Sequence, residues 1–135
     1  LIEEYVSGRE LTCGVLLSDG EIVALPITEI IPKNEYFDFE AKYKQGMSEE
    51  VVPANVPSGV SDQCKEISTQ LYRELNCRGV VRFDYIWTGA DFYFLEVNTV
   101  PGLSAASIVP KMARAYGWSF TELITRLIRE ALKKA

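Results

Sequence analysis

The chain begins with a pattern that is typical of paired β-strands. Every second residue from Leu11 to Leu17 is a buried-type side chain, which predicts a strand with one face in the core. Residues 18–20, Ser-Asp-Gly, favour a tight turn, and a second β-type run extends from Glu21 to Ile31. We therefore predict a β-hairpin over residues 11–31.

Residues 32–60 show neither the period of a helix nor that of a strand. They contain prolines, aromatic residues at 36, 37 and 39, and the polar stretch YKQGMSEE. Loops of this length in compact domains are usually functional lids or disordered linkers. The aromatic residues and the lysine within residues 36–43 favour a lid, so we predict a long lid loop over residues 32–60.

Three later segments have helical spacing of apolar residues. Ser61 is suited to cap the first helix, whose stripe is Cys64, Ile67, Leu71 and Leu75. A short second helix is predicted over residues 107–116, with Gly117 as its stop.

The last helix begins with a capping-box pattern formed by Ser119 and Glu122. Its buried stripe consists of Leu123, Leu127, Ile128 and Leu132. The order of strands, lid, helix, strands and helices predicts the α+β class, with an antiparallel sheet and helices packed on one face.

The stretch FDYIWTGADFYFLEVNTVPG reads as a second hairpin. If its turn is formed by residues 89–91, Asp84 faces Glu96 and Arg82 faces Asn98 across the two strands. Cross-strand neighbours have Cβ atoms about 4.5–5.5 Å apart, and like charges directly opposite each other destabilise a sheet. The two acids therefore need either water or a cation between them.

Strand alternation places Phe94, Glu96 and Asn98 on one face. A divalent cation such as Mg²⁺ fits the pair of carboxylates, because it takes oxygen ligands and is held by one or two carboxylates plus substrate phosphates. The alternative is a solvent-exposed sheet face on which Asp84 and Glu96 are merely hydrated. The following NTVPGLSAAS favours a ligand site, because a helix that starts there can offer backbone N–H groups to an anion.

Composition narrows the chemistry. The 135 residues suit one globular domain, and the start without Met suggests a piece of a longer polypeptide. A net charge of −5 argues against nucleic-acid binding, and no apolar run reaches the roughly 20 residues of a membrane helix. Histidine is absent, which excludes Ser-His-Asp catalysis. The three cysteines lack C-x-x-C spacing, so we expect a reducing, cytoplasmic setting.

Four motifs resemble one enzyme family. They are EEYVSGRELT at residues 3–12, FDFEAKY at 37–43, R-x-D at 82–84 and E-x-N-T-x-P-G at 96–102. Together they are similar to the ATP-grasp carboxylate–amine ligases and, within these, to the C-terminal domain of the D-alanine–D-alanine ligases. The resemblance spans nearly all of residues 1–135 and implies an ATP-grasp C-terminal subdomain.

The resemblance implies roles for the residues around the second hairpin. Two Mg²⁺ ions, with Mn²⁺ as a possible substitute, would be held by Asp84, Glu96 and Asn98. Arg82 would stabilise the transferred phosphoryl group, and the backbone N–H of Gly102 would be an oxyanion donor. Ser107 would bind the carboxylate of the second D-alanine. The alternative is that it only caps a helix.

Other matches implied by the resemblance contact the nucleotide or close over it. Glu3 and Val6 match the hinge that meets adenine, and Glu10 matches the acid that binds the ribose. Lys42 matches the lid lysine that reaches the γ-phosphate, and Tyr43 matches the lid tyrosine that closes over the site. Each of these could instead be an ordinary strand or surface residue.

The implied reaction is the ATP-dependent joining of two D-alanines through an acyl phosphate, for peptidoglycan precursors. The partners would be D-alanine, ATP and the N-terminal and central domains of the same polypeptide, without which the chain should be inactive. The full-length enzyme would be a homodimer. The alternatives are another ATP-grasp ligase that acts on a different carboxylate, or a noncatalytic nucleotide- or metal-binding module.

Overall fold

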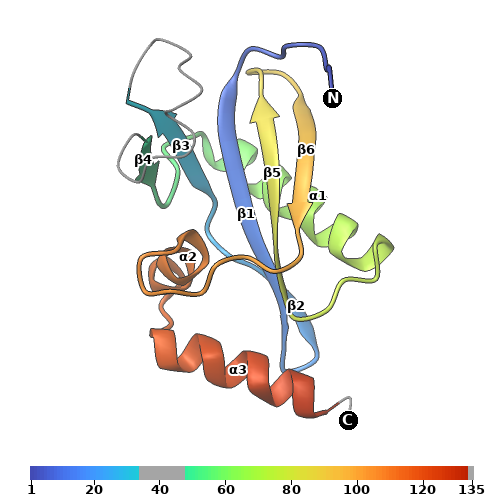
Figure 1. Ribbon diagram of the computed structural model, residues 1–135, viewed down its shortest axis with the longest axis vertical. Helices are drawn as coiled ribbons and strands as arrows, with labels where there is room; N and C mark the ends of the chain where they lie inside the picture. Colours follow the sequence, from blue (N-terminus) through green and yellow to red (C-terminus); the bar gives the residue numbers. More distant parts are fainter. Residues whose placement is uncertain (34–47, 134–135) are drawn as a thin grey trace.

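A single antiparallel sheet organises the molecule. The computed structural model describes residues 1–33 and 48–133. In these residues the strands of the sheet run in the order β4-β3-β1-β5-β6, with β2 paired to β1 beside this path (Figure 1). The elements in chain order are β1 (Arg9–Ser18), β2 (Glu21–Ala24), β3 (Thr28–Pro32), β4 (Ser48–Val51), α1 (Ser58–Glu74), β5 (Val80–Trp87), β6 (Phe92–Asn98), α2 (Ile108–Tyr116) and α3 (Phe120–Leu132).

The first hairpin is confirmed, but its second run is two strands. β2 pairs with the end of β1 at Val15–Ser18, and β3 pairs with the beginning of β1 at residues 10–12. Pro26 lies between the two short strands and has no N–H to donate to a sheet. The break therefore lets the chain use both ends of the long strand β1.

The predicted loop over residues 32–60 is shorter than expected. Among its described residues, 48–51 form strand β4, which pairs with β3, and α1 already begins at Ser58. The expected cap at Ser61 is wrong, because the N-cap position is Pro57 and the carbonyl of Pro57 accepts hydrogen bonds from Val60 and Ser61. A proline is well suited to a helix start, since its fixed φ fits the turn.

The predicted ends of the other helices are confirmed. Gly117 terminates α2 with φ of 106°, a left-handed conformation that glycine adopts without a steric penalty. Ser119 and Glu122 form the expected capping box of α3, in which each side chain accepts from the other residue's backbone N–H. No helix in the described part of the chain is both long and apolar enough to cross a membrane.

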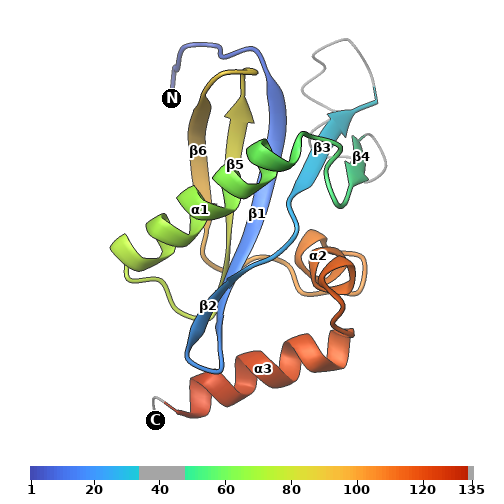
Figure 2. The ribbon, with the colours of Figure 1, turned by 180° about the vertical axis from the view of Figure 1, so that it is seen from behind.

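The helices divide between the two faces of the sheet. The α+β class with an antiparallel sheet is confirmed, but the expectation that the helices pack on one face is not. α1 covers the face that carries Leu11, Phe83 and Tyr85 (Figure 2). α2 and α3 pack on the other face against Leu16 and Leu25. In Figure 1 they lie over its lower part, and no helix of the described residues lies over its upper part, which we call the open face.

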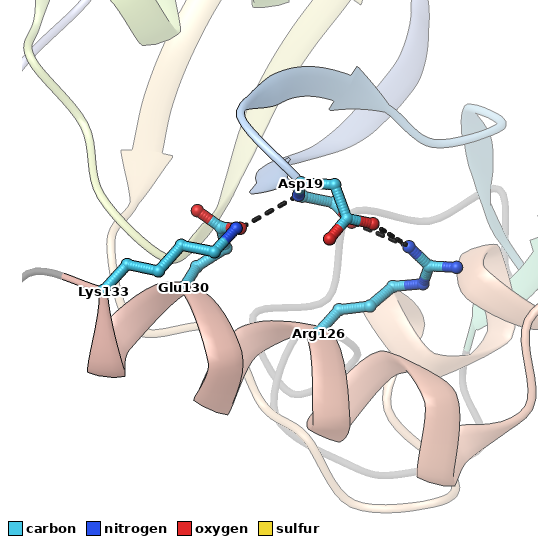
Figure 3. A network of polar contacts seen from close by, with 5 residues as sticks. Asp19, Arg126, Glu130 and Lys133 are labelled. Atoms are coloured by element: carbon cyan, nitrogen blue, oxygen red, sulfur yellow. Dashed lines mark hydrogen bonds and ion pairs between the residues drawn. The ribbon is translucent and has the colours of Figure 1, made fainter.

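A polar network ties α3 to the turn between β1 and β2 (Figure 3). Asp19 is at positive φ (52°) in that turn, and its backbone N–H donates to the Glu130 carboxylate at 2.9 Å. Arg126 donates to the carboxylate of the same aspartate at 3.1 Å and to the hydroxyl of Ser18. Lys133 completes the network with a 2.6 Å bond to Glu130.

Replacing Glu130 with glutamine is expected to lower the free energy of unfolding at neutral pH and to reduce its loss in acid. The hydrogen bond from Lys133 holds the pKa of the Glu130 carboxyl below its ordinary value of 4.5. Its stabilising contribution is therefore complete above pH 4.5 and is lost as the pH falls through the lower, folded-state pKa. Urea unfolding of both proteins between pH 3 and pH 7 checks this. The prediction would be contradicted if the free energies of unfolding of the two proteins changed with pH in the same way.

Candidate functional site

The pairing of β5 with β6 agrees with the prediction at the positions that matter for chemistry. Asp84 lies opposite Glu96, and Arg82 lies opposite Asn98. The register shifts by one residue after Asp84, and Leu95 has no Cα partner. Phe94 therefore lies opposite Tyr85 and packs edge-on against its ring, so the expectation that it shares a face with Glu96 is wrong.

Asp84 is the buried centre of the site, with only 7% of its surface exposed. Both of its oxygens accept from the guanidinium of Arg82, at 2.9 Å each, and Thr12 on β1 donates a further hydrogen bond. Bonding to Asp84 raises the pKa of Arg82, and the charges of Glu96 and Glu10 act in the same direction. Arg82 is therefore a fixed, permanently charged cation on the open face of the sheet.

The oxygen atoms of Asp84, Glu96 and Asn98 suit a hard cation if a bound ligand supplies further oxygens. Glu96 is exposed, and among the described residues no hydrogen bond to its carboxylate is seen. The Asn98 side-chain oxygen accepts one bond, from the N–H of Val100 at 3.1 Å, which leaves a second lone pair. No group of three or more metal-binding acids, cysteines or histidines occurs in the described residues. Mg²⁺ bound there would need additional oxygen ligands, as phosphates supply.

An open pocket beside this pair gathers residues that are far apart in the sequence. Its volume is about 270 Å³, and it brings together three predicted residues, Arg82, Gly102 and Ser107. Glu50 and Ser104 also line it, and the sequence analysis missed both. Ser104 stands only two residues after the E-x-N-T-x-P-G motif, so proximity could have signalled it. No sequence signal marks Glu50, which fell inside the expected lid.

Ser107 occupies the N-cap position of α2, but its side chain does not cap the helix. The hydroxyl accepts a hydrogen bond from the backbone N–H of Ser104 at 3.2 Å and shares another with the Ser104 hydroxyl at 2.7 Å. A Cβ at Gly102 would stand 2.9 Å from the Ser107 oxygen. Glycine at 102 therefore leaves the room in which Ser107 takes this position, and a capping role does not explain the side chain.

The remaining predicted residues are less closely gathered. Glu10 lies on β1 two residues before Thr12, on the face that carries Asp84, and its charge acts on Arg82. Glu3 is exposed and Val6 half-buried in the segment before β1, and neither lines the pocket. Lys42 and Tyr43 lie outside the described residues.

The buried thiols offer no alternative catalytic centre. Burial raises the pKa of Cys13 to about 12 and that of Cys64 further still. A thiolate is the reactive form of cysteine, and it would be scarce at neutral pH in both positions. The candidate chemical groups are therefore the carboxylates, the guanidinium, the hydroxyls and the backbone amides of the open face.

Solved structures define the class to which this fold and pocket belong. The chain is similar to the Bacillus anthracis D-alanine–D-alanine ligase complexed with ATP, with a TM-score of 0.77, 34% identity and coverage of 97% of this chain and 42% of that ligase. It is also similar to the VanG D-Ala:D-Ser ligase of Enterococcus faecalis, with a TM-score of 0.79, 32% identity and coverage of 93% and 36%. The architecture is therefore that of the C-terminal part of amino acid ligases.

Sequence comparison gives the family. The family model described as "D-ala D-ala ligase C-terminus" matches residues 1–129. The D-alanine–D-alanine ligase of Azobacteroides pseudotrichonymphae is 42% identical over 95% of this chain, and that of Novosphingobium aromaticivorans is 40% identical over 100% of it. The chain belongs to the D-alanine–D-alanine ligase C-terminal family. It spans 40% and 43% of the length of these two relatives.

Proposed function

We propose that this chain provides the nucleotide- and acceptor-binding part of a ligase that joins two D-alanines at the expense of ATP. Family membership supports this proposal, and the similar full-length proteins are D-alanine–D-alanine ligases. The observation that carries it is the pocket in which Arg82, Gly102 and Ser107 meet beside the Asp84–Glu96 pair. A solved relative complexed with ATP supports the choice of nucleotide.

Arg82 is suited to stabilise charge that develops during phosphoryl transfer. Its two bonds to Asp84 hold the guanidinium in place before any ligand arrives, so the cation does not have to reorganise during the reaction. Among the described residues, its Nη1 makes no hydrogen bond and is available to a ligand. In the proposed reaction it faces the phosphate that leaves ATP and the acyl phosphate of the first D-alanine.

Asp84, Glu96 and Asn98 would hold Mg²⁺ in this proposal. When bound, the ion would neutralise the phosphate oxygens of ATP. The residues supply oxygen donors only, which is the ligand chemistry that Mg²⁺ prefers. Thr12 helps to keep the Asp84 carboxylate oriented toward the open face by donating to it from β1.

The other pocket residues would position the reacting amino acids. The backbone N–H of Gly102 would donate to the oxyanion, and the hydroxyl of Ser107 would bind the carboxylate of the second D-alanine. Lys42 and Tyr43 would exclude water, so that the acyl phosphate meets an amine instead of hydrolysing. Glu3, Val6 and Glu10 remain proposed nucleotide contacts.

In the proposed ligase, this chain works together with further domains. Its relatives are more than twice as long, so the sites for the first D-alanine and for further phosphate contacts would lie in N-terminal and central domains. The full reaction is therefore to be tested in a polypeptide that joins residues 1–135 to those domains.

Phosphate release tests the proposed function. With ATP and Mg²⁺, the polypeptide is expected to release phosphate when D-alanine is added, and an Asp84→Asn variant is expected to lose this activity. L-alanine serves as the substrate control. Release with a different amino acid or carboxylate would favour another ATP-grasp ligase, and ATP binding without release would favour a noncatalytic module.

A further inference from the structure

Glu50 is a pocket residue without a role in the proposed reaction. It lies on β4 opposite Ile30 of β3, and Ile30 lies opposite Glu10 of β1. Cross-strand partners share a face of the sheet, and Glu10 shares its face with Thr12 and Asp84. The strand register thus places Glu50 on the open face, in agreement with its place in the pocket lining.

One oxygen of Glu50 remains available to a ligand. Oε2 accepts from the ammonium of Lys111 on α2 at 2.7 Å. Oε1 has no hydrogen bond in the part of the chain that the structure describes. The side chain is 25% exposed, and that of Lys111 is 35% exposed. A carboxylate can accept from cations on both oxygens, so the ion pair does not fill the capacity of Glu50.

The pocket has the charge pattern of a receptor for a small zwitterion. The hydroxyls of Ser104 and Ser107 can donate to a carboxylate, and Arg82 adds a positive charge to the same lining. Glu50 is the acid among the residues that line the pocket in the described structure, and only an acceptor of this kind can balance an ammonium group. The apolar part of the lining is small, since it consists of Ala106 and Ile108, and it suits a short side chain.

We propose that Glu50 binds the ammonium group of the acceptor amino acid and makes this site favour an amine over a hydroxyl. This inference rests on the proposed function, because it assigns the pocket to the second substrate. The two solved relatives described above are a D-alanine–D-alanine ligase and a D-Ala:D-Ser ligase, and each name gives two amino acids as the groups joined. A 2-hydroxy acid with the same carbon skeleton presents a neutral hydroxyl, which gains much less from a carboxylate.

The competing explanation is that Glu50 only fastens β4 to α2 through Lys111. Substituting either residue breaks the ion pair, but only a substitution of Glu50 removes the carboxylate from the pocket. The two kinds of variant therefore distinguish the two explanations. Glu50→Gln removes the carboxylate and keeps the shape of the side chain. Lys111→Met breaks the same ion pair and leaves the carboxylate in the pocket, so it is the matched control.

The test is steady-state kinetics of the ligase polypeptide with ATP, Mg²⁺, D-alanine as donor and either D-alanine or D-lactate as acceptor. Glu50→Gln is expected to raise KM for the D-alanine acceptor by about 10-fold to 100-fold, the loss of one charged hydrogen bond. It is expected to leave the use of D-lactate unchanged. Lys111→Met is expected not to raise the acceptor KM.

The outcomes distinguish this inference from the proposed function. Wild-type ligation with equal rises in KM for both variants would show that the pair is only structural and would overturn the inference alone. An unchanged preference for D-alanine over D-lactate in Glu50→Gln would do the same. Absence of D-alanine-dependent phosphate release by the wild type would refute the proposed function and the inference with it. Thermal unfolding of each variant verifies that it is folded.

Discussion

Replacing Arg82 with methionine is expected to reduce D-alanine-dependent phosphate release about 100-fold to 1000-fold, as for the loss of one preorganised charge-stabilising donor. The substitution removes both bonds to Asp84 and leaves that buried carboxylate without its cation. Breaking a buried ion pair from one side costs about 3–5 kcal/mol, and the 20% exposure of the Arg82 side chain favours the lower end. Initial rates and thermal unfolding measure the two effects.

Arg9 offers a matched control for this experiment. It also makes two bonds to one carboxylate, that of Glu29, at 2.6 Å each. Arg9 precedes Glu10 on β1, so strand alternation places it on the opposite face from the pocket. Arg9→Met is expected to lower stability by about 1–3 kcal/mol, typical of hydrogen bonds to a charged group, and to retain ligation. Equal loss of activity in both variants would contradict a specific role for Arg82.

Replacing Gly102 with alanine is expected to raise KM for the acceptor D-alanine about 10-fold to 100-fold, as for the loss of a hydrogen bond to a charged group. The new Cβ would stand 2.9 Å from the Ser107 oxygen, closer than such atoms normally approach. Ser107 must then move and give up its bonds to Ser104. Steady-state kinetics at saturating ATP measures the change.

Gly59 provides the control for a change from glycine to alanine. It lies in the first turn of α1, where a Cβ would meet nothing within 4 Å. Gly59→Ala is expected to stabilise the protein by about 0.4–1 kcal/mol and to leave the kinetics unchanged.

A double variant tests the contact between residues 102 and 107. In thermal unfolding, Ser107→Ala is expected to restore part of the stability that Gly102→Ala loses through this contact, because it removes the crowded oxygen. Strict additivity of the two substitutions would show that the contact is not responsible.

The predicted pairing of Asp84 with Glu96 is correct, but the turn at residues 89–91 does not by itself produce it. Next to the turn, Trp87 pairs with Phe92 and Tyr85 with Phe94, one residue away from the predicted register, and the shift at Leu95 then brings Asp84 opposite Glu96. The predicted register therefore fails between the turn and Leu95, which has no partner, and holds from Asp84 to Arg82. A bulge depends on packing along the strand, and the alternation of residues does not reveal it.

The sequence by itself determined the elements whose signals are local. Gly117 ends α2 because its left-handed backbone suits glycine, and Ser119 starts α3 because its hydroxyl and Glu122 satisfy free N–H groups at the helix start. The motifs around Asp84 and Gly102 likewise sufficed for the family. These signals need no knowledge of distant residues.

Only the tertiary structure decided which distant residues share the pocket. Glu50 reaches the open face because β4 pairs with β3 and β3 with β1, a long-range order that no local pattern encodes. The division of the helices between two faces also depends on where the sheet leaves apolar surface, at Leu11 on one side and Leu16 on the other. Burial of apolar surface is non-directional, so it reveals its partners only after the chain has folded.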